Sequence, residues 1–309
     1  IVQRILSTIP VMGVVVLFVF FLLRFAPGDP AALIAGDYAT PEDIAKIRIS
    51  LGLDKPVYEQ LAIWLQSLAQ ADLGTSIYSK LPVTHLMAQR LVPTLSLATS
   101  TLLFSVLLAV PLGTLAAWKA GSWVDRAVMI VAVAGFSLPV FWLGFLFIYG
   151  FSIKLGILPV QGFISPSESL WGFLRHLVLP TLTLGMVYMA LIARITRASV
   201  LEVLNQDYIR TATAKGVANP QVLWRHALKN AAVPIVTVVG IGIALLIGGV
   251  VVTESVFAIP GLGRLTVDSI LHRDYPVIQG IILVFSAVYV VINLAVDLSY
   301  TLLDPRIRY

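Results

Sequence analysis

The chain has 309 residues, of which 58% are hydrophobic and 12% are charged, and its mean hydropathy is +0.93. Soluble domains carry charge on about a quarter of their residues, so this composition excludes an ordinary soluble domain and indicates a protein that lies largely in lipid. The absence of cysteine removes disulfides, thiolate metal sites and thiol catalysis, and loops of uneven charge around membrane helices explain the net charge of +5 better than a nucleic-acid partner does.

Six long stretches of the chain are almost free of charged residues, and each approaches or exceeds the roughly 17 to 25 residues that cross a bilayer as a helix. The sequence therefore predicts an all-α, polytopic membrane protein with one transmembrane domain over 1–309. The expected helices cover about 5–25, 91–118, 127–153, 177–197, 230–253 and 276–303, with a long loop at 26–90 and a second loop at 198–229.

The loop after the first helix carries helix signals of its own. Pro-Gly-Asp at 27–29 follows Arg24 without a small-residue cleavage site, so we expect the first helix to be retained rather than removed as a signal peptide. Thr-Pro-Glu-Asp at 40–43 and Gly52 are typical of the start and the stop of a short helix. A second helix is expected from Pro56, and its apolar face serves either as a cap on the bundle, which the residues alone favour, or as a docking surface for an external protein. That face comprises Val57, Leu61, Trp64, Leu65 and Leu68.

Basic residues are distributed unevenly over the expected loops. Eleven lie on the side of the two termini and four lie in the short loops of the other side, whereas the stretch 24–90 is too long to be counted. The positive-inside rule therefore predicts that both termini and the 198–229 loop are cytoplasmic and that the 26–90 loop is outside. The first group is Arg4, Lys119, Arg126, Arg194, Arg197, Arg210, Lys215, Arg225, Lys229, Arg306 and Arg308, and the second is Lys154, Arg175, Arg264 and Arg273.

The segment 194–229, between the fourth and fifth expected helices, predicts a helix, a glycine turn and a second helix. Residues 207–215 form the first, which ends at Gly216, and Asn219 followed by Pro220 opens the next. Six basic and two acidic residues accompany them. Taken alone, this pattern is typical of an interfacial helix that rests on anionic lipid headgroups.

Small and polar residues interrupt the last two expected helices. Gly240, Gly242, Gly248 and Gly249 indicate a fifth helix that approaches its neighbours closely. At the outer end of that helix, Glu254 and the turn with Pro260, Gly261 and Gly263 are candidates for an outer gate.

In the sixth helix, Asp297 is a carboxylate that needs a partner or a wet cavity if it lies in the membrane. It shares a helical face with Asn293 and Tyr300, at the level where Arg194 or Arg197 leaves the fourth helix. We expect a pair between Asp297 and one of these arginines, with a latch between helices favoured over a contact with substrate.

Eight short segments, in order along the chain, carry a resemblance to a known family. They are APGDP (26–30), LGLDKP (51–56), DLGTS (72–76), DYIRTATAKG (207–216), RHALKNAAVP (225–234), ESVFAIPGLGRL (254–265), RDYPVIQG (273–280) and NLAVDLSYTLLDPRIRY (293–309). In this order they resemble the permease subunits of binding-protein-dependent ABC importers, in the dipeptide, oligopeptide, glutathione and nickel branch, of the dipeptide-permease B type. The resemblance covers nearly the whole chain.

The segment 207–216 looks like that branch's version of the loop that docks into the ATPase subunits. The wider superfamily has Glu-Ala-Ala there, followed by glycine four positions after the second alanine. Arg210, Thr211 and Ala212 occupy the three places here and Gly216 supplies the glycine, so only the last alanine and the glycine match. The departure puts the usual role of the glutamate in doubt, although the Arg-Thr-Ala form is itself similar to the peptide branch.

The resemblance implies a type I ABC importer permease fold in a bacterial cytoplasmic (inner) membrane. The partners that it implies are membrane lipid, a second homologous permease subunit, two cytoplasmic ATP-binding subunits and an extracytoplasmic substrate-binding protein. No nucleic-acid partner is expected. The resemblance assigns ATPase coupling to Asp207, Tyr208, Arg210, Thr211, Ala212, Ala214, Lys215 and Gly216. The fifth helix would lie beside the pore and the partner permease, an alternative to tight packing inside one subunit. Candidate residues of the translocation path or gate are Gly248, Gly249, Glu254, Pro260, Gly261, Asn293 and Asp297.

The chain has no GxxxxGK[ST] motif, so we expect it not to be an enzyme and to bind no cofactor, with ATP and Mg held by the partner subunits. The four histidines show no metal-ligand spacing, and no catalytic or metal site is expected. Di- or oligopeptides are the favoured substrates by family, while glutathione, nickel chelates and opines remain open. A self-contained channel or secondary transporter is the main rival, although no internal repeat of the kind common in such transporters is evident.

Overall fold

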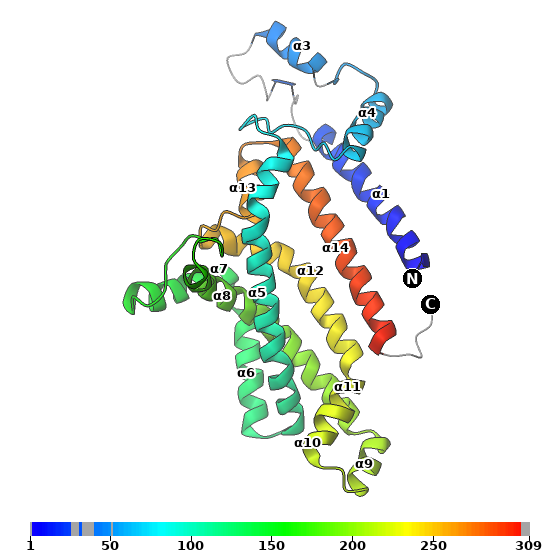
Figure 1. The fold of residues 1–309 in the computed structure, drawn as a ribbon, viewed down its shortest axis with the longest axis vertical. Coiled ribbons are helices and arrows are strands. Elements are labelled where there is room, and N and C mark those ends of the chain that lie inside the picture. Colours follow the sequence, from blue (N-terminus) through cyan, green and yellow to red (C-terminus); the bar gives the residue numbers. More distant parts are fainter. Residues whose placement is uncertain (1, 26–30, 33–39, 51, 304–309) are drawn as a thin grey trace. The chain divides into compact units, whose positions relative to one another are not determined.

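A computed structural model describes residues 2–25, 31–32, 40–50 and 52–303 of the chain. These residues are mainly helical, and the described part contains one isolated β-bridge, between Thr75 and Pro82. In the described part the chain forms two compact units, one built from 91–264 and 291–303 and the other mainly from 2–90 and 265–290. Figure 1 labels their helices. The type I permease architecture expected from the sequence agrees with this helical organisation.

Four helices in the described part are long and apolar enough to cross a membrane, and a fifth span results if one bent pair of helices is counted as one. A shorter apolar stretch, Leu6–Leu22, lies in α1 (Val2–Phe25). The four long helices are α5 (Val83–Trp118), α8 (Leu170–Leu204), α12 (Ala232–Val256) and α14 (Tyr275–Leu303). The count of six spans therefore stays a prediction.

Helix α8 is the centre of the first unit. It packs against α6 (Trp123–Ser137), α7 (Val140–Phe147) and α12. Its Leu184 and Tyr188 join Leu246 and Val250 of α12 in one buried apolar cluster. Because about 25 cal/mol is gained for each Å² of apolar surface removed from a polar solvent, and lipid supplies no such gain, close packing inside this cluster is the main attraction among these helices.

The third expected helix, 127–153, is not one straight helix. Helix α6 ends at Ser137, Leu138 has an extended backbone, and α7 starts at Val140 and continues into a π-helical segment at Ile148–Lys154. The two parts are bent by 106°. Pro139 explains the break, because proline lacks an N–H and disfavours the helical conformation of the residue before it.

Several helices extend beyond the expected limits. Helix α5 begins at Val83 rather than at 91, and α8 runs from Leu170 to Leu204 rather than over 177–197. At the start of α8, the hydroxyl of Ser169 accepts a hydrogen bond from the N–H of Gly172 at 3.1 Å. Charged residues mark where a helix leaves the apolar core, but they do not stop it, because capped helices continue into polar surroundings.

The second unit contains the two short helices expected in the 26–90 loop, α3 (Pro41–Ser50) and α4 (Val57–Ala69). Thr40 caps α3, since its hydroxyl accepts from the N–H of Asp43 and donates to the Asp43 carboxylate. These hydrogen bonds lower the pKa of Asp43 from its ordinary value, because they stabilise the ionised carboxylate. Trp64 of α4 lies against Phe20 of α1, with ring centroids 5.6 Å apart.

Two of the resembling segments meet in this unit. Asp274, which is only 3% exposed, accepts hydrogen bonds from the hydroxyl of Ser76 and from the N–H of Ile77 at 3.0 Å. Gly280 lies so close to Val83 that an added Cβ would come within 2.8 Å of its side chain. The DLGTS segment is thereby fastened to the start of α14, although about 200 residues separate the two in sequence.

Candidate functional site

The segment with the strongest resemblance forms a separate short helix, α9 (Asp207–Ala214), as expected. It follows α8 after Asn205 and Gln206 and ends at Gly216, whose φ is +78°. The N–H of Gly216 donates to the Thr213 carbonyl at 3.0 Å, and the N–H of Val217 donates to the Ala212 carbonyl at 3.2 Å. This is the glycine-terminated helix end that satisfies the last carbonyl groups, and it accounts for the glycine at this position.

Helix α9 is held by one buried residue and exposes most of the others. Ile209 is 4% exposed and Ala212 is half-buried. The remaining expected coupling residues are exposed, namely Asp207, Tyr208, Arg210, Thr211, Ala214, Lys215 and Gly216. The structure therefore brings these residues together on a surface, and Ile209 is the anchor that the motif comparison did not single out.

The charges on α9 are solvated. Arg210 lies 3.6 Å from Asp207, and both side chains are largely exposed, so this pair contributes little to stability. Partial burial raises the pKa of Tyr208 above its ordinary value, because the ionised phenol loses hydration. The cationic groups of Arg210 and Lys215 are thus available to an external partner, although the same exposure fits a simple solvated face.

Several helix ends form an apolar cluster next to the segment on which α9 packs, and we call it the junction cluster. It combines Ala117 at the end of α5, Val200 near the end of α8, and Ala231 and Ile235 around the start of α12. Leu223 and Ala227, in the π-helical segment Val222–Ala227 against which α9 packs, complete it. Through this segment, α9 adjoins a cluster that three of the long helices share.

The segment after α9 also follows the sequence prediction. Helix α10 (Asn219–Gln221) starts at Asn219, and the chain passes through the π-helical segment and α11 (Leu228–Asn230) into α12. Gly248 of α12 is exposed, and a Cβ added there would meet nothing within 4 Å. A Cβ added to Gly249 would lie 2.6 Å from Leu184 of α8, so this glycine packs inside the subunit.

Glu254, at the end of α12, is completely buried. Its carboxylate accepts a hydrogen bond from the Thr94 hydroxyl at 2.6 Å and one from the Arg264 N–H at 2.9 Å. The N–H of Leu262 donates to the hydroxyl oxygen of Thr94 at 2.7 Å. Gly261 lies directly against the Glu254 carboxylate, in a space that a Cβ would fill.

The turn around Glu254 is therefore an internal fastening in the described structure, with Pro260 exposed at its surface. Sequence reasoning selected Glu254, Pro260 and Gly261 as an outer gate, and that role stays a prediction. It missed Thr94, because a threonine in a long apolar helix gives no signal of the carboxylate it contacts about 160 residues later.

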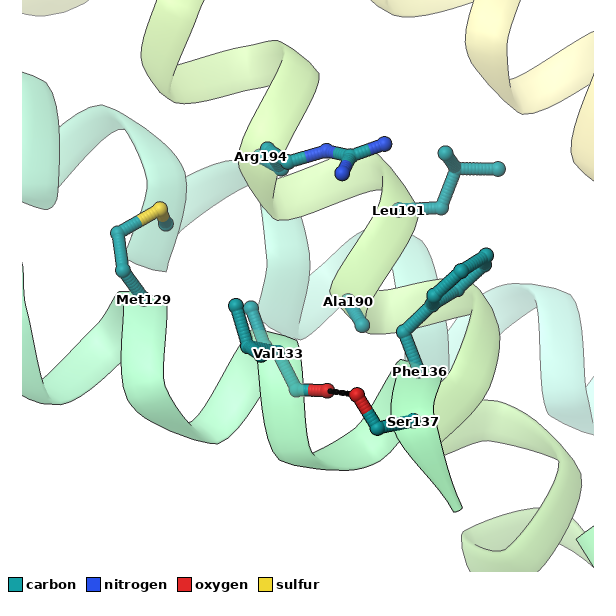
Figure 2. Close-up of a pocket in the computed structure, with 8 residues that line it drawn as sticks. Met129, Val133, Phe136, Ser137, Ala190, Leu191 and Arg194 are labelled. Atoms are coloured by element: carbon teal, nitrogen blue, oxygen red, sulfur yellow. Dashed lines mark hydrogen bonds between the residues drawn. The ribbon is translucent and has the colours of Figure 1, made fainter. Parts of the chain in front are cut away.

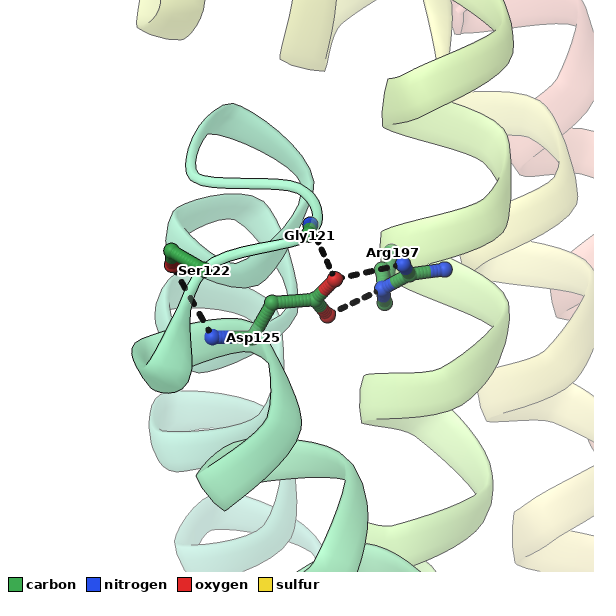
Figure 3. A network of polar contacts seen from close by, with 4 residues as sticks. All are labelled: Gly121, Ser122, Asp125 and Arg197. Atoms are coloured by element: carbon green, nitrogen blue, oxygen red, sulfur yellow. Dashed lines mark hydrogen bonds and ion pairs between the residues drawn. The ribbon is translucent and has the colours of Figure 1, made fainter.

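Arg197 pairs with a residue that the sequence analysis did not suggest, and the expected pair of Asp297 with Arg194 or Arg197 stays a prediction. The Arg197 guanidinium makes a two-point ion pair with Asp125 of α6, with Nε donating to Oδ1 and Nη2 donating to Oδ2 at 2.7 Å (Figure 3). The N–H of Gly121 donates to the same carboxylate at 2.9 Å. On α14, Asn293 is exposed and Asp297 is half-buried. The capping sequence Ser-Trp-Val-Asp at 122–125 could have located the start of α6, but not the partner of Asp125.

Arg194 lies one turn before Arg197 and lines a small groove between α6 and α8, with a volume of about 90 Å³ (Figure 2). The walls of this groove are apolar apart from Arg194 and Ser137. The Ser137 hydroxyl donates a hydrogen bond to the Val133 carbonyl at 2.8 Å. In the described residues, no three His, Cys, Asp or Glu side chains are grouped to hold a metal ion.

The chain matches two family models that together cover most of its length. Residues 109–309 match the model of the binding-protein-dependent transport system inner membrane component, and residues 1–98 match the N-terminal model of the same kind of membrane component.

Curated relatives match over the full length of the chain. A probable peptide ABC transporter permease from Sinorhizobium fredii is 52% identical over all of this chain and 99% of the relative. A putative peptide transport system permease from Brucella abortus is 46% identical, and the glutathione transport system permease GsiC of Escherichia coli K12 is 44% identical, each over 100% of this chain and 98% of the relative.

Among solved structures, the inward-facing MetNI methionine ABC transporter matches with a TM-score of 0.59 and 18% sequence identity, over 72% of this chain and 97% of the matched chain. At this identity the likeness concerns the fold alone.

Proposed function

This chain belongs to the family of binding-protein-dependent transport system inner membrane components, and from that premise we propose that it forms half of the translocation path of an ATP-driven importer of short peptides. Its family comprises permeases of peptide and glutathione ABC importers. The assembly that we propose contains this chain, a second homologous permease, two cytoplasmic ATP-binding subunits and an extracytoplasmic binding protein.

The proposal depends mainly on the exposure of α9. A helix with one buried anchor, Ile209, and a largely exposed remainder is suited to lie in a cleft of another protein. The small side chains of Ala212 and Ala214 allow a close approach, and Arg210 and Lys215 supply charge that orients the contact. We infer that α9 is the element on which the ATPase subunits act.

The junction cluster supports a lever role for α9. Because the ends of α5, α8 and α12 meet in the junction cluster, which includes the segment that α9 packs against, closure of an ATPase dimer around α9 would shift these helix ends together. Packed interfaces of this kind respond to such a shift by changing between discrete arrangements rather than by bending continuously.

Hydrolysis belongs to the partner subunits in this proposal. The chain has no phosphate-cradling GxxxxGK[ST] segment, so ATP and Mg would be held by the ATPases. The excess of basic residues in the loops on the side of α9 supports a cytoplasmic position for α9 and for both termini in the inner membrane.

Short peptides are the substrate class that we propose, because several full-length relatives are named as peptide permeases. Glutathione is the second candidate, favoured by the relatives named as glutathione permeases at 44–45% identity. Gly248 of α12, where an added Cβ would meet nothing within 4 Å, is a candidate path residue that is exposed.

The test is purification of the tagged chain from native membranes in mild detergent, followed by mass spectrometry of the proteins that accompany it. We expect a second permease and ATPase subunits, and ATP-dependent peptide uptake after reconstitution of the complex with its binding protein into liposomes. Recovery of the chain alone under several mild conditions would favour a channel or secondary transporter.

A matched pair of variants tests the role of α9. Ala214→Trp adds bulk to the exposed face of α9, whereas Ala120→Trp adds the same bulk to an exposed position in the turn between α5 and α6. We expect the first variant to lose the ATPase subunits and the second to keep them. Equal retention by both variants would contradict docking through α9.

A further inference from the structure

Part of the contact between α6 and α8 is made by small residues. A Cβ added to Gly135 of α6 would lie 3.0 Å from the Met186 carbonyl of α8, and Ala132 of α6 is buried. A Cβ added to Gly113 of α5 would lie 2.6 Å from the Ala193 carbonyl of α8. Small residues permit this close approach, and at these positions they interlock less than large side chains would.

The Asp125–Arg197 pair is a directional contact between α6 and α8 (Figure 3). Two parallel N–H to oxygen hydrogen bonds fix the orientation of the guanidinium as well as its distance from the carboxylate. The Asp125 side chain is 6% exposed and that of Arg197 is 27% exposed, so water screens the pair weakly. Separating the two would leave a buried carboxylate without its cation.

The pair lies on a continuous path to α9. Helix α8 runs without interruption from Arg197 to Leu204, about 10 Å along its axis at 1.5 Å per residue, and α9 begins at Asp207. Asp125 also holds the turn between α5 and α6 through the N–H of Gly121. The junction cluster joins the same helix ends, but its apolar contacts are non-directional.

The C-terminal end of α6, at Ser137, is separated from α7 by a break in the helix. The break at Leu138 and Pro139 separates it from α7, so α6 can change its angle to α7 without losing a helical hydrogen bond there. Four elements therefore follow one another along this path. They are α9 with the end of α8, the two-point Asp125–Arg197 pair, α6, and the break between α6 and α7.

We propose that the Asp125–Arg197 pair makes α6 follow α8 when the ATPase subunits displace α9, so that both residues are positioning residues for transport. The proposal deepens the proposed function and rests on it, because it needs α9 to be the element that the ATPases move. Asp125 and Arg197 themselves need touch neither substrate nor ATPase in this mechanism.

The first test measures peptide uptake and ATP hydrolysis together, in liposomes that contain the full importer and its binding protein. We expect Asp125→Asn and Arg197→Gln to keep the ATPase subunits and most of the hydrolysis but to lower the peptide transported per ATP by about tenfold, within the range typical of coupling between sites. Arg126→Gln is the matched control, since Arg126 is the exposed neighbour of Asp125, and we expect it to transport normally.

Two further variants distinguish a loss of coupling from misfolding of the chain. Arg197→Lys keeps the charge but loses the two-point geometry, so we expect an intermediate loss of coupling. The exchange of Asp125→Arg with Arg197→Asp restores a pair of opposite charges, and we expect it to recover transport per ATP relative to either single exchange. A purely structural role predicts instead that assembly and hydrolysis fall in parallel with transport, and that result would overturn the proposal.

The second test observes the motion of α6 directly. The chain has no cysteine, so spin labels can be placed at Trp123→Cys on α6 and Phe145→Cys on α7, both of which are exposed. We expect the distance between the labels to change when the complex is trapped with ATP, and this change to be lost in Asp125→Asn while the ATPases stay bound. A change of normal size in Asp125→Asn would refute the proposal.

Failure of the proposed function and failure of the ion-pair role give different results in these experiments. If the unaltered complex shows no ATP-dependent uptake and no ATPase partners, the proposed function fails. If the unaltered complex transports normally and the single variants transport as much peptide per ATP, the proposed function stands and the role of this ion pair fails.

Discussion

Helix α9 and the turn around Glu254 were both selected from sequence motifs, but the structure treats them in opposite ways. Helix α9 buries Ile209 and exposes its charges, whereas Glu254 is completely buried and its carboxylate is held by Thr94 and the backbone of Arg264. The difference shows that a motif can mark an exposed surface or a buried hydrogen-bonded contact, and that burial distinguishes the two. Changes at the turn should therefore act on stability, while changes at α9 should act on partner binding.

The largest effect is expected for Glu254→Ala. The change leaves the Thr94 hydroxyl and the Arg264 N–H without their buried acceptor, so we expect the free energy of unfolding to fall by about 4 kcal/mol. Denaturant unfolding of the purified chain in detergent measures the loss. Ser255→Ala, at an exposed neighbouring position, is the control and should change stability by less than about 0.5 kcal/mol. Equal stabilities of the two variants would mean that the turn is not a fastening.

A somewhat smaller loss is expected for Gly261→Ala, because the new methyl group would occupy the space of the Glu254 carboxylate. Overpacking at such a buried site costs about 3 kcal/mol. Gly248→Ala is the matched control, since its added methyl group meets open space within a helix, where alanine is favoured over glycine by about 1 kcal/mol. The comparison between the two regions weakens if Gly261→Ala unfolds at the same denaturant concentration as Gly248→Ala.

At α9, Ile209→Ala should cost about 2 kcal/mol locally, because it removes the one buried side chain of this short helix. We expect faster amide hydrogen exchange over 207–216 and weaker retention of the ATPase subunits, while global unfolding changes little. Thr213→Ala, at an exposed position of α9 outside the expected coupling residues, serves as the control. A large drop in global stability with normal ATPase retention would place Ile209 in the core instead of in a docking element.

The smallest effect is expected for Gly216→Ala. The backbone of Gly216 has φ of +78°, which costs a residue with a Cβ about 1 kcal/mol although no neighbour obstructs the methyl group. We expect the end of α9 to fray, seen as faster exchange of the Val217 amide, with a modest loss of ATPase binding. Gly216→Asn should be milder, because asparagine tolerates this conformation, and an unchanged exchange rate in Gly216→Ala would contradict a strained helix end.

Local signals in the sequence located most of the helices. The Thr40 cap, the Gly52 stop, and the helix at 207–215 with its Gly216 end are all present in the structure, because each depends on hydrogen bonds between residues a few positions apart. Helix limits were less accurate where charged residues were taken as ends, as in α8, because a capped helix extends beyond its apolar part.

Proline positions predict helix breaks only in part. Pro139 coincides with a bend of 106°, yet Pro93 and Pro111 lie inside α5 and Pro180 lies inside α8. In membrane helices the packing of neighbours and side-chain hydroxyls can compensate for a missing N–H, so proline alone does not decide whether a helix breaks.

The membrane location, the helical elements and the family resemblance can all be read from the amino-acid sequence, because hydropathy, helix caps and ordered motifs are properties of short segments. The pairing of Arg197 with Asp125, the enclosure of Glu254 by Thr94 and the glycine turn, and the burial of Ile209 in α9 became evident from the three-dimensional arrangement. These contacts join side chains from different helices, and which helices meet, at which register, follows from the packing of the whole bundle.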